Sequence, residues 1–146
     1  MEDVENQRMN GNVLCPGLGD YLIVQARNNH WSNHRLHSAC LRLPPPEYYA
    51  NRPSYFGSIH IHLDHIVFVD WLHLERLTGE QYLPTNVGLE LHSELAPLVE
   101  DQVTADKALI EYCEAATPET LVSKVSFNLL DGTHYTEAVW SLLAHL

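Results

Sequence analysis

The run over residues 58–70 constrains the fold of this chain more than any other stretch. It reads S-I-H-I-H-L-D-H-I-V-F-V-D, and in its first half apolar and polar residues alternate. Because strand side chains point alternately to the two faces of a sheet, this alternation predicts the longest strand of the protein. Its polar face would carry His60, His62 and Asp64. His65 has the parity of the core face and would join them only if the strand bulges or ends near Asp64.

Three further segments are predicted as strands from apolar alternation or β-branched content: residues 21–26, 39–43 and 87–92. The prolines at positions 44–46 end the second of these strands, because proline cannot donate a hydrogen bond to a sheet. We therefore expect an exposed, extended connector over residues 44–56.

Helical patterns dominate after the histidine run. Asp70 is typical of a helix N-cap and Gly79 of a helix end, which predicts a short helix between them. An apolar stripe with helical spacing covers residues 96–115.

The last part of the chain carries its own start and turn signals. Thr117 precedes a proline, as at a helix N-terminus, but residues 121–130 fit either a helix or a strand. A turn at Asp131 and Gly132 would lead into a last helix capped by Thr133. The predicted fold class is α+β, with a strand-rich N-terminal half that forms a small mixed or antiparallel sheet. C-terminal helices would pack on this sheet.

Length and composition predict one globular domain. The chain has 146 residues, of which 45% are hydrophobic. Residues 1–11 are polar and are expected to form a flexible acidic arm, with the single domain over residues 12–146. The three cysteines are odd in number and far apart, which favours reduced thiols over a disulfide framework.

Composition also limits the partners and the location. Eight basic residues oppose nineteen acidic ones, so the formal net charge is −11. Nucleic-acid binding draws on Lys and Arg replacing counterions, so the composition argues against it and favours a protein partner with a basic surface. Negative charge that only keeps the domain soluble is the simpler alternative. No apolar run reaches the roughly 20 residues of a membrane span, and the N-terminus lacks the features of a secretory signal, so we expect a cytoplasmic or nuclear protein.

The density of histidine in the run predicts a metal site. The chain has ten histidines, and imidazole and carboxylate are common ligands of zinc. The predicted Zn²⁺ ligands are His60, His62, Asp64, His65 and, from another strand, His92. The alternative is that these side chains form the polar face of a half-solvated strand and bond to cross-strand partners.

The same run resembles the H-x-H-x-D-H motif of the metallo-β-lactamase superfamily. The resemblance implies that His60 and His62 would bind one metal, while Asp64 and His65 would bind a second or orient a water for hydrolysis. The chain departs from that family in its shorter length and in the apolar residues 66–69, where the family usually has a small-residue turn. The motif alone therefore does not assign the chain to this family.

A second cluster of ligand-type residues lies upstream: His30, His34, His37 and Cys40. On a helix their spacing would place them on one face, but the surrounding pattern predicts a loop that leads into a strand. A ligand set drawn from both clusters stays open.

The proline connector contains a candidate docking motif. Pro45, Pro46 and Tyr48 satisfy P-P-x-Y, the pattern that WW domains bind as a stiff polyproline segment. A rigid loop with Tyr48 packed inward explains the pattern equally well.

Two functions from different classes follow. The first is a small acidic interaction domain, an adaptor or inhibitor that acts by surface complementarity and carries the histidine-built metal site as an optional feature. The second is a small metal-dependent, hydrolase-like enzyme centred on His60, His62, Asp64 and His65. The absence of a complete catalytic set favours the first.

Overall fold

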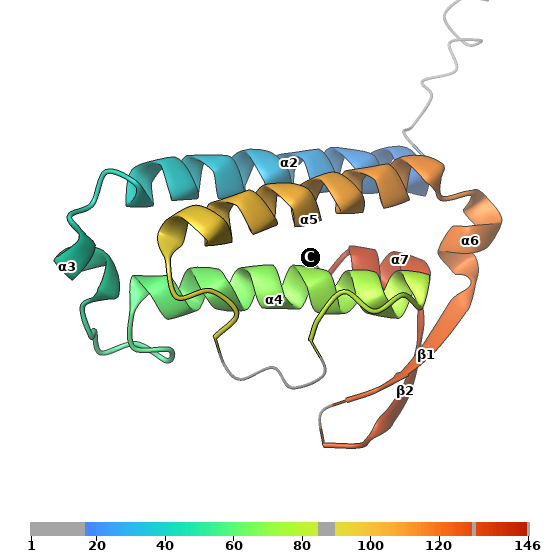
Figure 1. The fold of residues 1–146 in the computed structure, drawn as a ribbon. Helices are drawn as coiled ribbons and strands as arrows, with labels where there is room; N and C mark the ends of the chain where they lie inside the picture. Colours follow the sequence, from blue (N-terminus) through green and yellow to red (C-terminus); the bar gives the residue numbers. More distant parts are fainter. Residues whose placement is uncertain (1–16, 85–89, 130, 146) are drawn as a thin grey trace, which may run out of the picture.

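The structure, a computed structural model, describes residues 17–84, 90–129 and 131–145, and in these ranges the chain is mostly helical (Figure 1). Helices account for 65% and strands for 8%. Three long helices form the body of the molecule: α2 (Leu18–Cys40), α4 (Ile59–Thr78) and α5 (Leu95–Ala115). Helix α5 packs against both α2 and α4, and α2 runs in the opposite direction to the other two (Figure 1).

Short elements connect and follow the long helices. Helix α3 (Pro45–Tyr49) lies between α2 and α4 in the chain, and α6 (Pro118–Val122) follows α5. An antiparallel hairpin comes next, formed by β1 (Lys124–Asn128) and β2 (His134–Ala138), with the first residue of β1 opposite the last residue of β2. Helix α7 (Val139–Leu143) then packs against α4.

The predicted α+β fold with a strand-rich N-terminal half is wrong. Residues 21–26 lie in α2 and residues 59–70 lie in α4, while the two described strands are near the C-terminus. In α4 the buried side chains recur at helical spacing: His60, Leu63, Asp64, Val67, Asp70, His73, Leu74 and Leu77. A short alternating run also fits a helix, because its i and i+4 positions share a face, and packing against α5 selects the helix.

The strand predicted over residues 39–43 is also wrong, because residues 39 and 40 end α2 and residues 41–43 form a turn. The connector over residues 44–56 is not extended throughout. Pro45 begins α3, where its fixed φ and missing N–H suit the first helical turn.

Two predictions fall partly or wholly outside the described residues. Of the strand predicted over residues 87–92, only residues 90–92 are described, and they are irregular. The predicted arm over residues 1–11 lies outside the described ranges.

Local start and stop signals near the ends of elements are largely confirmed. Helix α4 ends at Gly79, whose φ of 74° is in the left-handed region, although it begins after Ser58 and not at Asp70. The helix predicted over residues 96–115 is α5, and the Thr117 side chain caps α6 by accepting a hydrogen bond from the next turn. Of residues 121–130, whose helix or strand state the sequence leaves open, 121 and 122 end α6 and 124–128 form β1. The predicted cap Thr133 precedes β2 instead of a helix.

The core of the three long helices has two apolar clusters separated by a buried polar layer. One cluster gathers Leu22, Ala26, Leu77, Leu109, Cys113, Leu121, Val139, Leu142 and Leu143. The other gathers Cys40, Tyr48, Leu63, Val67 and Leu98. Along each of the three helices the buried polar residues lie between members of the two clusters: Asn33, His37, Asp70, His73, Gln102 and Asp106.

Candidate functional site

Helix α4 separates the predicted metal ligands into an inward and an outward pair. His60 and Asp64 are four residues apart, so they share the inward face, where their exposed fractions are 2% and 0%. His62 and His65 are three residues apart and share a different, half-buried face. A strand would have placed His60, His62 and Asp64 on one face. In the helix, His62 lies on a different face from the other two.

Both ring nitrogens of His60 have hydrogen-bonding partners. Its Nδ1 lies 3.0 Å from the Tyr48 hydroxyl, and its Nε2 lies 3.0 Å from Oε1 of Glu90. Burial raises the pKa of Tyr48, so this side chain stays a neutral phenol. The arrangement leaves His60 no free lone pair for a metal ion.

Asp64 anchors the segment that precedes α5. Its carboxylate accepts hydrogen bonds from the backbone N–H of Leu91 at 2.6 Å, the backbone N–H of His92 at 3.0 Å, and Nδ1 of His92 at 2.8 Å. On the other side of the ring, Nε2 of His92 lies 3.1 Å from Oδ2 of Asp101. Because carboxylates only accept hydrogen bonds, Nδ1 of His92 donates to Asp64, and Nε2 faces the carboxylate of Asp101. Asp64 and His92 therefore hold the chain together here and leave no nitrogen for a metal.

The outward pair is differently placed. Nδ1 of His62 lies 2.6 Å from the Ser58 carbonyl oxygen and donates to it, which leaves Nε2 as the lone-pair nitrogen. The same Phe56 ring contacts both imidazoles, with ring centroids 5.0 Å from His62 and 4.4 Å from His65. Phe68 stacks on the other side of His65 at 6.2 Å. Two imidazoles thus contact one aromatic ring.

These two side chains do not complete a metal centre by themselves. Within residues 17–84, 90–129 and 131–145, no group of three or more His, Cys, Asp or Glu side chains is arranged to hold a metal ion. The outward pair supplies two nitrogen ligands, and a tetrahedral zinc ion takes four.

The upstream cluster of α2 belongs mainly to the buried polar layer. Nδ1 of His30 lies 3.0 Å from Oδ2 of Asp106, whose other oxygen accepts a hydrogen bond from Asn33. Burial lowers the pKa of His37 and raises the pKa of the Cys40 thiol, so both stay uncharged. Three members of this predicted cluster therefore face the core as neutral or hydrogen-bonded groups.

The polar layer continues into α4 through Gln102 of α5. The Gln102 amide donates to Asp70 at 2.6 Å and to Asp106 at 3.0 Å. Burial, with a smaller contribution from the charge of Asp106, raises the pKa of Asp70 to about 6, while the hydrogen bond from Gln102 opposes the shift. One acceptor, Oε1 of Gln102, is buried without a partner among the described residues.

Comparison with known proteins identifies no family. No family model and no curated protein matches the chain. Among the described residues no helix has both the length and the apolar character needed to cross a membrane.

The predicted docking residues of the proline segment do not share one surface. Pro45 and Pro46 are exposed, but the Tyr48 side chain is buried, with an exposed fraction of 2%, and contacts His60. A WW domain needs this tyrosine on an extended segment, so the helical conformation of α3 does not present the motif. The inward-packed alternative for Tyr48 matches its position.

Sequence reasoning missed the polar layer and the contacts of the segment before α5. A signal for the layer was present, because Gln102 and Asp106 lie four residues apart on the same face of α5 as Leu98 and Leu109. No local signal connects Asp64 with His92, which is 28 positions away. Contacts of this kind depend on how the helices pack.

Proposed function

We propose that this chain binds a divalent transition-metal ion, zinc by preference, with His62 and His65 of α4 as its histidine ligands. One observation carries the proposal. His62 donates its one hydrogen bond through Nδ1 and keeps Nε2 available, and the imidazoles of His62 and His65 both contact Phe56. The polar atoms of His60, Asp64 and His92 already have hydrogen-bonding partners within the fold.

The spacing and orientation of the pair support metal binding. Ligands at positions i and i+3 of a helix project to the same side, as in helical carboxylate–histidine metal sites. The hydrogen bond from Nδ1 of His62 to the Ser58 carbonyl fixes the tautomer and the ring orientation, a common arrangement behind metal-bound histidine. With two positions left to water, a bound zinc ion would supply an activated water, which is the chemistry of a hydrolase.

Metal titration of the purified full chain tests the proposal. We expect zinc binding by calorimetry and native mass spectrometry, weakened at least tenfold in His62→Ala and in His65→Ala and lost in the double variant. His34→Ala is the matched control, because it removes an exposed histidine of α2 outside the pair. Zinc-dependent hydrolysis of simple ester and phosphate substrates, lost in the same variants, would support the enzyme function.

Two results would overturn the metal site. The first is that the wild-type chain binds no zinc. The second is that the His62 and His65 variants bind zinc as tightly as the His34 variant does. Circular dichroism of each variant checks that the helical fold is retained, so that a lost affinity reports a lost ligand.

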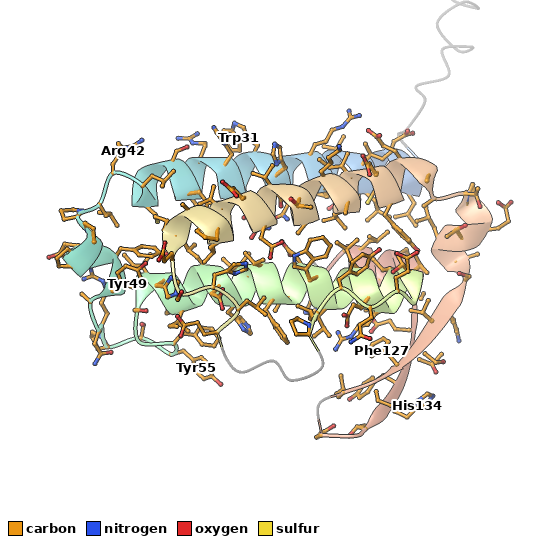
Figure 2. All side chains as sticks on the ribbon, viewed as in Figure 1. Trp31, Arg42, Tyr49, Tyr55, Phe127 and His134 are labelled. Carbon is orange, nitrogen blue, oxygen red and sulfur yellow. The ribbon has the colours of Figure 1, made fainter. Side chains whose placement is uncertain are left out.

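A second candidate function is the acidic interaction domain, an adaptor or inhibitor. A stripe on the outer face of α2 favours it, because Tyr21, Val24 and Trp31 are exposed by 52%, 59% and 54% at helical spacing. Figure 2 shows Trp31 on the outer side of α2, away from α4 and α5. Exposed aromatic and aliphatic side chains in line are typical of protein-binding surfaces. The net charge of −11 favours a partner with a basic surface.

A further inference from the structure

A small pocket lies where α4, α5 and the segments around residues 82–84 and 91–92 meet. It encloses about 230 Å³. Trp71 and Tyr82 form an aromatic wall, with ring centroids 5.0 Å apart and an angle of 32° between the rings. His92 and Asp101 form its polar side. The pocket is separate from the His62–His65 pair, so the inference below does not depend on the metal site.

The polar side of the pocket carries an excess of negative charge. Oδ1 of Asp101 accepts a hydrogen bond from Nε1 of Trp71 at 3.0 Å, and Oδ2 of Asp101 lies 3.1 Å from Nε2 of His92. The second nitrogen of His92 donates to the buried Asp64. The ring of His92 thus lies between two carboxylates, those of Asp64 and Asp101.

The surroundings of Tyr82 add to this negative potential. Its backbone N–H donates to Glu75 at 2.7 Å, and its hydroxyl donates to Glu80 at 2.9 Å. None of the described residues that line the pocket is Lys or Arg. A cation that enters the pocket would therefore meet aromatic faces and carboxylates without a competing positive side chain.

We propose that this pocket binds a small organic cation, and that the cation is a quaternary ammonium group. The aromatic pair supplies cation–π attraction, and Asp101 and Asp64 supply the surplus negative charge. A primary ammonium group carries three N–H donors that need acceptors, and the aromatic rings of Trp71 and Tyr82 offer only their faces. A quaternary ammonium has no N–H donor that needs an acceptor, so cation–π attraction and nearby carboxylates can offset the cost of removing its charge from water.

The probes are choline chloride, its neutral carbon isostere dimethylbutanol, and ethanolamine as the primary ammonium analogue. Binding to the full chain is followed by calorimetry and by the indole N–H resonance of Trp71, which is assigned from its loss in Trp71→Phe. We expect choline to shift this resonance and to bind at least tenfold more tightly than either analogue. Trp140→Phe, on α7, is the control and leaves the choline affinity unchanged.

Two variants identify the groups responsible. Asp101→Asn keeps the size of the side chain and removes its charge, so we expect choline affinity to fall at least tenfold. Tyr82→Leu removes part of the aromatic wall from a residue that is 39% exposed, and the fold should tolerate it. Tyr82→Leu should also lower the affinity for choline, while the circular dichroism of the variant stays helical.

Each contrary result overturns the proposal. Equal binding of choline and dimethylbutanol would show an apolar pocket without cation selectivity. Equal or tighter binding of ethanolamine would show that N–H donors are accepted after all. No shift of the Trp71 resonance at millimolar choline would show that no ammonium site exists here.

Discussion

The protonation of Asp70 is coupled to folding. It lies in the buried polar layer with an exposed fraction of 6%, and its carboxylate accepts a hydrogen bond from Gln102. Burial raises its pKa from an ordinary value of 3.8 to about 6. The protonated form is therefore favoured in the folded chain relative to the unfolded chain.

The sign of this linkage predicts a stabilising substitution. As pH rises from below the ordinary pKa of Asp70, the unfolded chain releases the proton first, so the free energy of unfolding falls until pH passes about 6. Asp70→Asn keeps an acceptor for Gln102 and removes the charge. We expect the variant to be more stable than the wild type at neutral pH, by about 3 kcal/mol at most, with the gain vanishing near pH ~4.

Urea denaturation of both chains across this pH range measures the effect. Glu111→Gln, at an exposed carboxylate of α5, is the control and should change stability by less than about 0.5 kcal/mol. A wild type that is more stable than Asp70→Asn at neutral pH, or a gain that does not vary with pH, would contradict the assigned role of burial.

The hydrogen-bonding partners of each histidine determine whether its ring nitrogens can bind a ligand. His60 and His92 have the same side chain as His62, but their ring nitrogens are held by Tyr48, Glu90 and carboxylates of the fold. The sequence predicted a metal site from residue types alone and could not assign these hydrogen bonds. A ligand set is decided by the partners that each nitrogen meets in three dimensions.

Helix α4 begins after a serine N-cap and ends at a left-handed glycine. The Ser58 hydroxyl accepts a hydrogen bond from the backbone N–H of Ile61 at 3.2 Å, and Gly79 ends the helix with φ of 74°. An N-cap and a left-handed glycine about twenty residues apart are typical of one uninterrupted helix. The alternation over residues 59–64 suggested a strand because six residues are too few to separate the two periods.

Gly79 provides the prediction at the scale of this element. A side chain there has no atom within 4 Å to meet, so the cost of Gly79→Ala arises from the positive φ alone. We expect a loss of about 1 kcal/mol in the free energy of unfolding. Gly19→Ala is the matched control, because its added carbon meets Leu121 at an ordinary 3.7 Å and its φ is not positive.

Urea or thermal denaturation followed by circular dichroism compares the two alanine variants. The Gly19 variant should equal or exceed the wild type in stability, since alanine favours the helix more than glycine does. Equal effects of the two substitutions would contradict the cap assignment of Gly79.

The whole molecule combines a strongly acidic charge with an exposed apolar stripe on α2. Cζ of Arg35 lies 4.7 Å from the centroid of the Trp31 ring. At this end of the stripe the indole therefore forms a cation–π contact at the surface. If the chain acts as an adaptor or inhibitor, charge would steer a basic partner and the stripe would supply the apolar contact.

Partner capture tests this at the scale of the molecule. We expect the full chain to retain proteins with basic surfaces at low salt and to lose them as salt screens the charge. Trp31→Ser should abolish capture, whereas Trp140→Ser, at a tryptophan of α7 that is 43% exposed, should not. Captured proteins that resist salt, or that are lost equally in both variants, would contradict the interaction function.

Features that depend on neighbours along the chain were predictable from the residues alone. The helix over residues 96–115, the cap at Thr117, the stop at Gly79 and the turn at Asp131–Gly132 were all predictable, because caps and turns are bonds between residues a few positions apart. The acidic surplus and the density of histidine were equally plain in the composition.

Contacts between helices that are far apart in the sequence depend on the tertiary structure. The first 40 residues gave no strong local signal for α2, and the strand or helix state of the histidine run depended on packing against α5. The pairs Asp64–His92 and Asn33–Asp106 join residues 28 and 73 positions apart. Such contacts form when helices bury their faces together, and burial then determines which imidazoles are bonded and which remain available for a ligand.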